Sequence, residues 1–500
     1  MTDMSLSGRA DAFRTMRAQA EASILPLATS LDGRRFSFQA RIDGLDLRLG
    51  GYVMLEGDGG AKLGQVRSLV VGETDLGEVG LPGDDGADVR TRLRIRLARG
   101  DGVILERGAK PFHDHLTRAA TADEVRAWQA GAAPARASLA VGNLSLAGET
   151  PVSLDAGGFD RHTFLCGQSG SGKSYALGLV LEQLLLETDP RIVILDPNSD
   201  CARLAELREE VPHDHAARWA ALAPGIRVRS AESPGHDRLR LRFGELAPAT
   251  QAALLQLDPV ADREEYAELR ALLAEFRPES LSELADADRP EARRLALRLG
   301  NLGVEGLGVW ARADAGSLHD DLDDPGARCL VVDTGSLPTR EEQALVAESV
   351  LRGVWERRRE RRPVLLVIDE AHNVCPAATA DALTALATEH AVRIAGEGRK
   401  FGIYMLVATQ RPQKVHENVI SQCDNLVLMR LNSSADAAFI AAMFGFAPPG
   451  LVRLATDFRL GEALVAGKLA SHPAVLRFGA RVAREGGGDV RADWAAPATR

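Results

Sequence analysis

The stretch Gly167-Gln168-Ser169-Gly170-Ser171-Gly172-Lys173-Ser174 decides the fold of this chain, because it fits the phosphate-binding pattern GxxxxGK[ST] at every position. The apolar residues 164–166 precede it as the end of a buried strand, and aliphatic residues recur at helical spacing after it, up to Glu187. Strand, glycine-rich loop and helix form the local structure that this motif needs. The alternative is a Gly/Ser turn that precedes a helix by chance. We therefore predict that the chain binds a nucleoside triphosphate.

Each part of this phosphate loop has an expected role. The glycines let successive backbone N–H groups turn towards a β-phosphate, and the N-terminus of the following helix adds a positive partial charge. Lys173 is expected to reach the β- and γ-phosphates, and the hydroxyl of Ser174 is expected to bind Mg²⁺. The predicted nucleotide-binding residues run from Gly167 to Tyr175.

Length and composition limit the classes of protein to consider. Five hundred residues are too many for one compact core and suggest two to four units. A hydrophobic content of 45% with 26% charged residues is typical of a soluble globular protein. No aliphatic run approaches the roughly 20 residues that span a bilayer, and charged residues interrupt the N-terminus. We therefore expect a cytoplasmic protein without a membrane segment or a signal peptide.

Cysteine content and net charge exclude some kinds of site. The 5 cysteines are scattered and form no CxxC pair, so we expect buried thiols, not disulfides or zinc ligands. The net charge of −10 argues against a uniformly basic coat for nucleic acid. It leaves open a basic stripe inside a ring or a cleft.

The segment 31–130 has the alternation of apolar and polar residues that is typical of short strands. The expected strands lie near 36–38, 45–49, 52–56, 63–71 and 93–97, with glycine-rich turns at 57–60 and 100–102. Strands of this kind predict a small β-barrel, which follows a weakly helical leader at 1–30. Arg92, Arg94 and Arg96 are expected to form a solvated strand face, with contact to phosphates as the alternative.

From about residue 138 the pattern becomes that of an α/β protein. Buried strands are predicted at 164–166, 191–195, 329–332, 364–368, 403–408, 426–429 and 463–465. The capping box Thr339-Arg340-Glu341-Glu342 predicts the start of a helix. We thus predict a mostly parallel sheet between helices over 138–480, with a helical insertion at about 201–319. Residues 481–500 are expected to form a loose tail.

The predicted strand 364–368 carries the second half of a nucleotide-hydrolysing site, because it ends in Asp369 and Glu370. Asp369 is expected to hold Mg²⁺ through water, and Glu370 to polarise the attacking water. The strand at 403–408 delivers Gln410 to the same edge of the sheet. Its amide can hydrogen-bond both water and a γ-phosphate. Pure nucleotide binders need no such base, so we predict hydrolysis.

Several further motifs give the chain a resemblance to a known family. They are Val-Ile-Asp-Glu-Ala-His-Asn (367–373), Glu-Gly-Arg-Lys-Phe-Gly (397–402), Ala-Thr-Gln-Arg-Pro (408–412), Ser-Gln-Cys-Asp-Asn (421–425) and Arg-Leu-Asn (430–432). With the phosphate loop, they resemble the HerA branch of the HerA/FtsK superfamily. The stretches 50–58 and 63–66 resemble the N-terminal barrel of that family, the HAS-like domain. The resemblance covers nearly the whole chain.

The resemblance implies a homo-hexameric ring with a RecA-like core, which hydrolyses ATP with Mg²⁺ and moves double-stranded DNA through its centre. Arg161 matches a trans-acting arginine of the family, and Arg399 matches a second catalytic arginine. The alternative for Arg161 is a structural ion pair with Asp160 or Asp155. The loop after Asp196 reads Pro-Asn-Ser-Asp, where the family usually has Pro-His-Gly-Glu, so its role is left open.

Two functions are compatible with such a ring. The first is a DNA translocase or helicase that serves a nuclease partner of the NurA type in end processing. The second is an ATPase scaffold that assembles and gates an antiphage effector, such as a sirtuin-like or nuclease subunit. Because aromatic residues make up only 5% of the chain, capture of single strands by base stacking has little support. Contact with a DNA backbone remains possible, and the motor is the preferred hypothesis.

Overall fold

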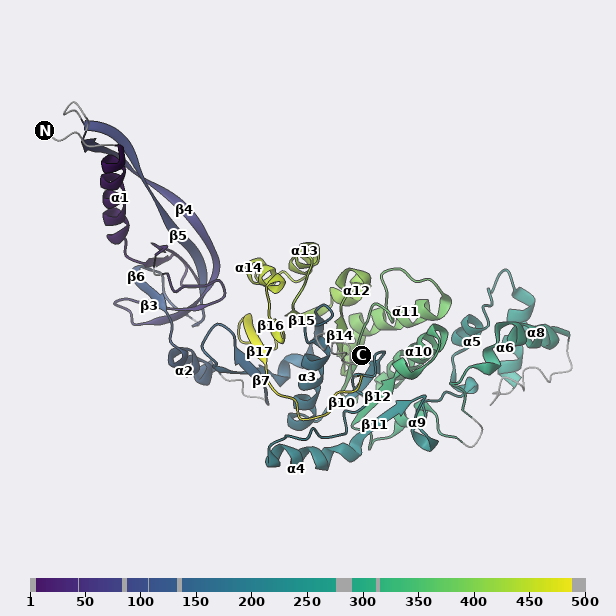
Figure 1. Ribbon diagram of the computed structural model, residues 1–500. Coiled ribbons are helices and arrows are strands. Elements are labelled where there is room, and N and C mark those ends of the chain that lie inside the picture. Colours follow the sequence, from purple (N-terminus) through teal and green to yellow (C-terminus); the bar gives the residue numbers. More distant parts are fainter. Residues whose placement is uncertain are drawn as a thin grey trace, which may run out of the picture.

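The computed structural model describes residues 6–43, 45–82, 88–106, 108–132, 137–275, 290–311 and 315–487. It contains a closed β-barrel followed by an 11-stranded sheet with helices on both faces (Figure 1). The predicted α/β class with a mostly parallel sheet is therefore confirmed. The last residues of the predicted loose tail, 488–500, lie outside the described part.

The large sheet has the strand order β11-β12-β10-β13-β14-β9-β15-β16-β17-β7-β8. The strands from β11 to β15 in this order run parallel, and the others pair antiparallel. Their bounds are β7 Ser138–Leu144, β8 Pro151–Asp155, β9 His162–Cys166, β10 Arg191–Asp196, β11 Ile226–Ser230, β12 Cys329–Asp333, β13 Val364–Ile368, β14 Ile403–Thr409, β15 Cys423–Met429, β16 Glu462–Gly467 and β17 Ala474–Phe478. Each apolar run predicted to be a strand of this sheet lies in one of these strands.

Helices cover both faces of the sheet, so its parallel strands are buried on both sides. In β10, Ile192 and Ile194 pack with helix α3 (Lys173–Glu187), whereas Val193 and Leu195 pack with α10 (Arg340–Glu356) and α11 (Ala382–Glu397). The predicted capping box of Thr339 opens α10. The remaining helices of the core are α4 His213–Leu222, α9 Leu318–Asp323, α12 Glu417–Ile420, α13 Ser434–Met443 and α14 Pro449–Arg453.

The predicted helical insertion at 201–319 is only partly helical, because β11 lies within it as the edge strand of the sheet. Its sequence, Ile-Arg-Val-Arg-Ser, has few apolar residues. Arg229 instead forms ion pairs with Asp237 (2.5 Å) and, through Nε, with Asp321 (2.6 Å). Besides α4, the described part of the insertion contains α5 Pro248–Leu254, α6 Arg263–Glu275 and α8 Pro290–Leu302, and these three helices extend beyond α10 (Figure 1).

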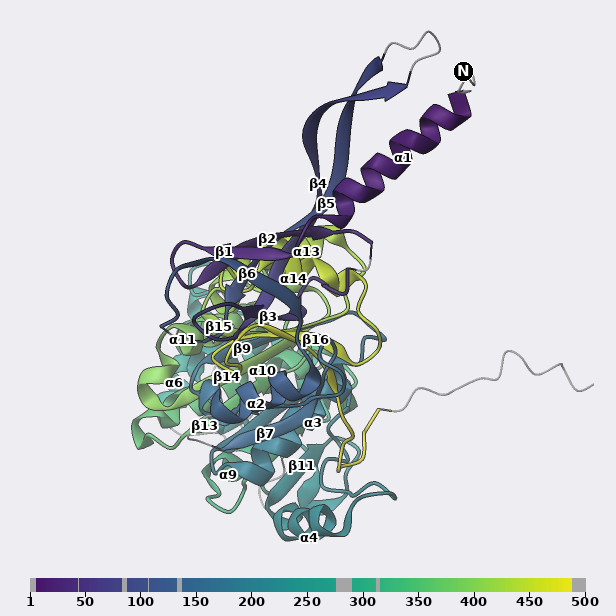
Figure 2. The same cartoon turned by 90° about the vertical axis from the view of Figure 1, so that its left-hand side faces the viewer.

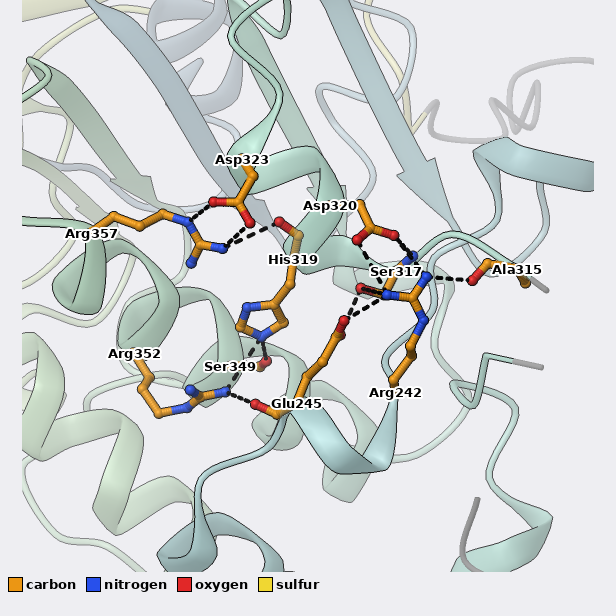
Figure 3. A network of polar contacts seen from close by, with 10 residues as sticks. All are labelled: Arg242, Glu245, Ala315, Ser317, His319, Asp320, Asp323, Ser349, Arg352 and Arg357. Atoms are coloured by element: carbon orange, nitrogen blue, oxygen red, sulfur yellow. Dashed lines mark hydrogen bonds and ion pairs between the residues drawn. The ribbon is translucent and has the colours of Figure 1, made fainter. Parts of the chain in front are cut away.

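A polar network ties the insertion to helices α9 and α10 (Figure 3). Arg242 pairs with Glu245 at 2.7 Å, and the backbone oxygen of Glu245 accepts a hydrogen bond from Arg352 of α10 (2.8 Å). The buried ring of His319 in α9 lies between these groups, 3.4 Å from Arg352. Arg191, the first residue of β10, donates to the backbone of α9. The network thus lies at the amino ends of the parallel strands.

The N-terminal barrel closes in the order β1-β2-β5-β4-β3-β6. The bounds are β1 Leu27–Ser30, β2 Arg35–Arg41, β3 Tyr52–Glu56, β4 Lys62–Pro82, β5 Asp88–Ile104 and β6 Phe112–Ala119. Helix α2 (Ala122–Ala132) follows the barrel. The barrel packs on the antiparallel part of the large sheet, where Tyr52 and Met54 share a buried cluster with Leu144 and Ala474.

Two local predictions for the barrel are wrong. Residues 45–48 form no strand, and Gly100 and Gly102 lie inside β5, not in a turn. A Cβ atom at Gly100 would overlap the ring of Phe38, and one at Gly102 would overlap the ring of Phe36. These glycines therefore make room for aromatic rings in the barrel core.

Strands β4 and β5 continue beyond the barrel as a two-stranded arm, alongside helix α1 (Leu6–Ala22) (Figure 2). On the exposed face of the arm, Arg92 pairs with Asp75 at 3.1 Å and Arg94 pairs with Glu73 at 3.2 Å. Cross-strand carboxylates thus balance these arginines, as expected for a solvated strand face.

All five cysteines are buried and free, as predicted. Among the helices of the described part of the chain, none combines the length and the apolarity that crossing a bilayer requires.

His162, at the start of β9, is buried and held in one neutral form. Its Nδ1 accepts a hydrogen bond from the Met405 N–H (2.9 Å), so Nε2 carries the proton and donates to the Ala395 carbonyl (3.0 Å). Burial, and to a lesser extent the charge of Arg399, lowers the pKa of His162 to about 4.

We expect this histidine to make the protein less stable in mild acid. Below the ordinary histidine pKa of about 6.5, His162 becomes protonated in the unfolded chain. In the folded protein it stays neutral until about pH 4. Between pH 7 and pH 5, His162 should therefore cost about 2 kcal/mol of unfolding free energy. Urea unfolding at both pH values measures this loss, which should be smaller by that amount in His162→Gln. Equal losses in the two proteins would contradict the assignment.

Candidate nucleotide-hydrolysis site

The phosphate loop joins the carboxyl end of β9, in the middle of the sheet, to the first residue of α3, Lys173. Gly170 and Gly172 have φ angles of 71° and 92°, which a side chain would strain. Arg430 of the Arg-Leu-Asn motif supports the loop from β15. Its side chain donates to the Gly170 carbonyl (2.9 Å), and its own carbonyl accepts from the Gln168 N–H (3.0 Å). Sequence reasoning gave Arg430 no such role.

Lys173 lies at the centre of the site, between the two acids that end β13. Its Nζ contacts Asp369 Oδ1 and lies 3.1 Å from Glu370 Oε1. Burial alone would lower the pKa of Lys173, but the charges of the two carboxylates outweigh burial and raise it. The lysine is therefore a fixed cation at the position where the motif requires one.

Glu370 is held by several donors in a left-handed backbone conformation, with φ of 44°. Gln410 donates to it from Nε2 (2.7 Å) and from its backbone N–H (3.3 Å), and His372 Nδ1 lies 3.3 Å away. Burial would raise the pKa of Glu370, but the hydrogen bond from His372, the charge of Lys173 and the bond from Gln410 lower it to about 2. Glu370 is thus ionised and oriented, as a general base must be.

His372 is a site residue that the sequence pattern did not single out. Besides Glu370, its Nδ1 contacts Thr409 Oγ1 at 3.1 Å, so it bridges the ends of β13 and β14. Its place two residues after Glu370, within the Val-Ile-Asp-Glu-Ala-His-Asn motif, is the signal that points to it.

Of the predicted Mg²⁺ ligands, Asp369 contacts Lys173, and Ser174 is the next residue after Lys173 in α3. Asp369 is 2% exposed, and its Oδ2 has no hydrogen-bond partner among the described residues. A hydroxyl and a carboxylate are the hard oxygen ligands that Mg²⁺ prefers. Within the described residues, no three His, Cys, Asp or Glu side chains form a ready-made metal site. The residues therefore fit an ion that arrives with nucleotide phosphates as its other ligands.

Arg161 and Arg399 lie at the amino ends of the parallel strands, whereas the phosphate loop lies at their carboxyl ends. The 5 residues of β9 separate Arg161 from that loop, which is roughly 17 Å of extended chain. Both arginines contact Asp424 Oδ2, Arg399 at 2.8 Å and Arg161 at 3.5 Å. Arg161 also pairs with Asp160 at 3.2 Å. Asp160 is one of the two partners expected if Arg161 forms only a structural ion pair.

Asp424 holds the two arginines from an irregular position in β15. The register of β15 with β9 shifts between Cys423 and Asn425, so Asp424 leaves the strand ladder. The side chains of Arg161, Arg399 and Asp424 remain 40%, 35% and 46% exposed. This group is therefore accessible from outside the subunit, whereas it cannot reach the subunit's own phosphate loop.

The chain is similar to several known proteins. The family model described as "Helicase HerA, central domain" matches residues 139–295. The "DNA double-strand break repair helicase HerA" of Sulfolobus acidocaldarius is 22% identical over 482 residues, covering 86% of this chain and 88% of that protein. The protein of the same name from Saccharolobus solfataricus is 22% identical over 459 residues, with the same coverage of both chains. Among solved structures, VirB4 of Thermoanaerobacter pseudethanolicus has a TM-score of 0.47 and 15% identity, covering 70% of this chain and 98% of that chain.

Proposed function

The chain is a HerA/FtsK-type ATPase, and from this we propose that it acts as a hexameric ring that couples ATP hydrolysis to movement along double-stranded DNA. The observation that carries the proposal is the distance between the arginine pair and the phosphate loop. Arg161 and Arg399 fit a catalytic role only if they complete the site of a neighbouring subunit. A ring of head-to-tail contacts supplies such a neighbour to every site.

Within one subunit, the residues around the phosphate loop have separate roles in hydrolysis. Lys173 binds and neutralises the terminal phosphates, and ionised Glu370 takes the proton of the attacking water. Gln410 and His372 orient Glu370 through their hydrogen bonds. Mg²⁺, which Ser174 and Asp369 would hold, neutralises charge on the phosphates when it is bound.

Arg161 and Arg399 of the adjacent subunit would then neutralise the charge that spreads over the γ-phosphoryl oxygens. A planar guanidinium suits this task, because it presents several N–H donors in a fixed geometry. Asp424 gathers both guanidinium groups at one place on the outside of the subunit. One neighbouring site therefore receives both arginines together.

The proposed substrate is double-stranded DNA, because the HerA relatives are named as double-strand break repair helicases. We propose a nuclease as the partner, as the resemblance to the HerA branch implies. The chain has a net charge of −10, so DNA is expected to contact a limited basic surface inside the ring.

Linear duplex DNA should raise the ATPase rate of the purified protein. Its affinity should fall steeply with salt and show little sequence preference. If about six phosphates are contacted, affinity should drop by about 10³-fold between 50 and 200 mM salt. Fluorescence anisotropy with a labelled duplex measures this slope. If added DNA left the ATPase rate unchanged and no binding of DNA were measurable, the scaffold that gates an effector subunit would be favoured.

A further inference from the structure

A cavity of about 500 Å³ lies at the amino ends of β10, β12 and β13, at the other end of the parallel strands from the phosphate loop. Its wall contains five arginines and three acids, namely Arg191, Arg328, Arg357, Arg358 and Arg362 with Asp189, Asp324 and Glu360. Five positive charges against three negative ones leave the wall with an excess of two positive charges. None of these residues belongs to the site around Lys173.

Backbone carbonyls, not carboxylates, bind Arg191, Arg328 and Arg358. The acceptors lie in α9 for Arg191 (2.5 and 2.6 Å), just after α3 for Arg328, and near the end of α10 for Arg358 (2.9 Å). Among the described residues, no carboxylate is in ion-pair contact with any of these three arginines. Because a carbonyl oxygen is a neutral acceptor, these bonds orient the guanidinium groups without neutralising them.

The acids in the wall offset little of this charge. Asp324 pairs at 3.5 Å with Arg227, which does not line the cavity, and Glu360 lies 3.8 Å from Arg362. All four of these side chains are more than a third exposed, so solvent weakens both contacts. A bound anion would supply the missing negative charge.

Arg191 also has a hydrogen-bond donor without an acceptor. Its Nε is buried and has no hydrogen-bond partner in the part of the chain that the structure describes. Burial lowers the pKa of Arg191, Asp324 offsets part of this effect, and the charges of Arg357 and Arg362 lower the pKa further. Of these two arginines, Arg357 is held by Asp323 at 2.6 Å (Figure 3). The environment of Arg191 therefore favours the arrival of a negatively charged group.

The volume of the cavity and its apolar wall favour a small molecule as the ligand. Small-molecule sites usually have volumes of roughly 300–1,000 Å³. The apolar part of the wall consists of Val193, Leu322, Ala327, Val354, Val364 and Ile403. A flat ring can pack on these side chains, while phosphate oxygens accept hydrogen bonds from the fixed N–H donors of the guanidinium groups. A nucleotide combines such a ring with a phosphate.

We propose that this cavity is a second nucleotide-binding site, in which Arg191, Arg358 and Arg362 bind the phosphate and the apolar wall receives the ring. The site is distinct from the phosphate loop, where Lys173 is expected to reach the β- and γ-phosphates. Adenosine monophosphate (AMP) has neither of these phosphates, so it distinguishes the two sites. Binding in the cavity requires neither ATP hydrolysis nor DNA.

Titration of the full-length protein with a fluorescent AMP analogue tests the proposal. One analogue should bind per subunit, both in the wild type and in Lys173→Ala. Arg358→Gln should weaken binding by about 10–100-fold, because a hydrogen bond to a charged group is lost. Arg362→Gln should weaken it less, since this side chain is 63% exposed and solvent screens its charge. For the same reason, Arg362→Gln should leave the fold intact.

Competition experiments separate the contribution of the ring from that of the phosphate. Unlabelled AMP should displace the analogue at a concentration lower by about 10-fold or more than inorganic phosphate, because only AMP buries an apolar ring. Glu360→Gln should strengthen binding, because it removes a negative charge from the wall. A wall that only supports the fold would show no such gain.

Arg203→Gln is the matched control, because Arg203 is exposed in the loop after β10 and pairs with Glu206 at 2.5 Å. It should leave binding of the analogue unchanged. The absence of saturable binding, or its loss in Lys173→Ala, would overturn the proposal. So would equal affinities for AMP and inorganic phosphate. If duplex DNA bound in place of AMP and Arg358→Gln weakened it, the arginines would contact a DNA backbone and the proposal would be wrong.

Discussion

Replacement of Glu370 by glutamine is expected to slow ATP hydrolysis by about 10²–10⁴-fold while ATP still binds. Glutamine has the same shape and keeps one oxygen, which can accept one of the two hydrogen bonds that Gln410 donates to Glu370. It cannot take a proton from water. Because Lys173 keeps its contact with Asp369, the loop that binds the phosphates should remain in place.

Steady-state ATPase rates and equilibrium binding of a fluorescent ATP analogue separate these two effects. Glu389→Gln serves as the control, because Glu389 is exposed in α11 and pairs with Arg393 of the same helix at 2.7 Å. It should leave both quantities unchanged. If Glu370→Gln lost binding and turnover to the same extent, Glu370 would be a metal ligand or a structural residue instead of the base.

Mixing two inactive variants, Arg161→Ala and Lys173→Ala, is expected to restore ATPase activity. Arg161→Ala keeps a working phosphate loop, and Lys173→Ala keeps a working arginine pair. Where the two subunits meet in the right order, one composite site is intact. With equal amounts and independent sites, about a quarter of the interfaces in a head-to-tail ring should be active.

The measurement needs verified exchange of subunits, for example by energy transfer between labelled copies. Asp424→Asn provides a second test of the same surface. It leaves the phosphate loop intact but loosens both arginines, so it should also complement Lys173→Ala. No recovery despite exchange would exclude a trans-acting Arg161, and full activity of Arg161→Ala alone would exclude any catalytic role for it.

The sequence by itself determined the elements that bury apolar residues on both sides. The strands near the phosphate loop read as unbroken apolar runs because helices cover both faces of the sheet. Thus the predicted strand at 191–195 is β10 (Arg191–Asp196), and the one at 364–368 is β13 (Val364–Ile368). The glycine-rich loop between a strand and a helix is equally local, so its place could be predicted without the rest of the chain.

Where distant residues provide the stabilising contacts, the local pattern was not sufficient. The edge strand β11 has arginines in place of apolar residues, and Asp321, far along the chain, pairs with one of them. Gly100 and Gly102 resemble a turn, yet they lie in a strand because the rings of Phe36 and Phe38 occupy the space beside them. Both features depend on residues far away in the sequence, namely Asp321 of α9 beside β11, and Phe36 and Phe38 of β2 beside β5.

The residues of the functional site also fall into those that the sequence predicted and those that only the tertiary structure placed. Lys173, Ser174, Asp369, Glu370 and Gln410 were predicted from motifs whose chemistry is encoded in their own residue types. Only the tertiary structure placed His372 against Glu370, and Arg161 and Arg399 on Asp424. The physical reason is the strand order β10-β13-β14-β9-β15, which brings these side chains together at the two ends of the parallel strands. That order arises from packing across the whole chain, which no local stretch of sequence encodes.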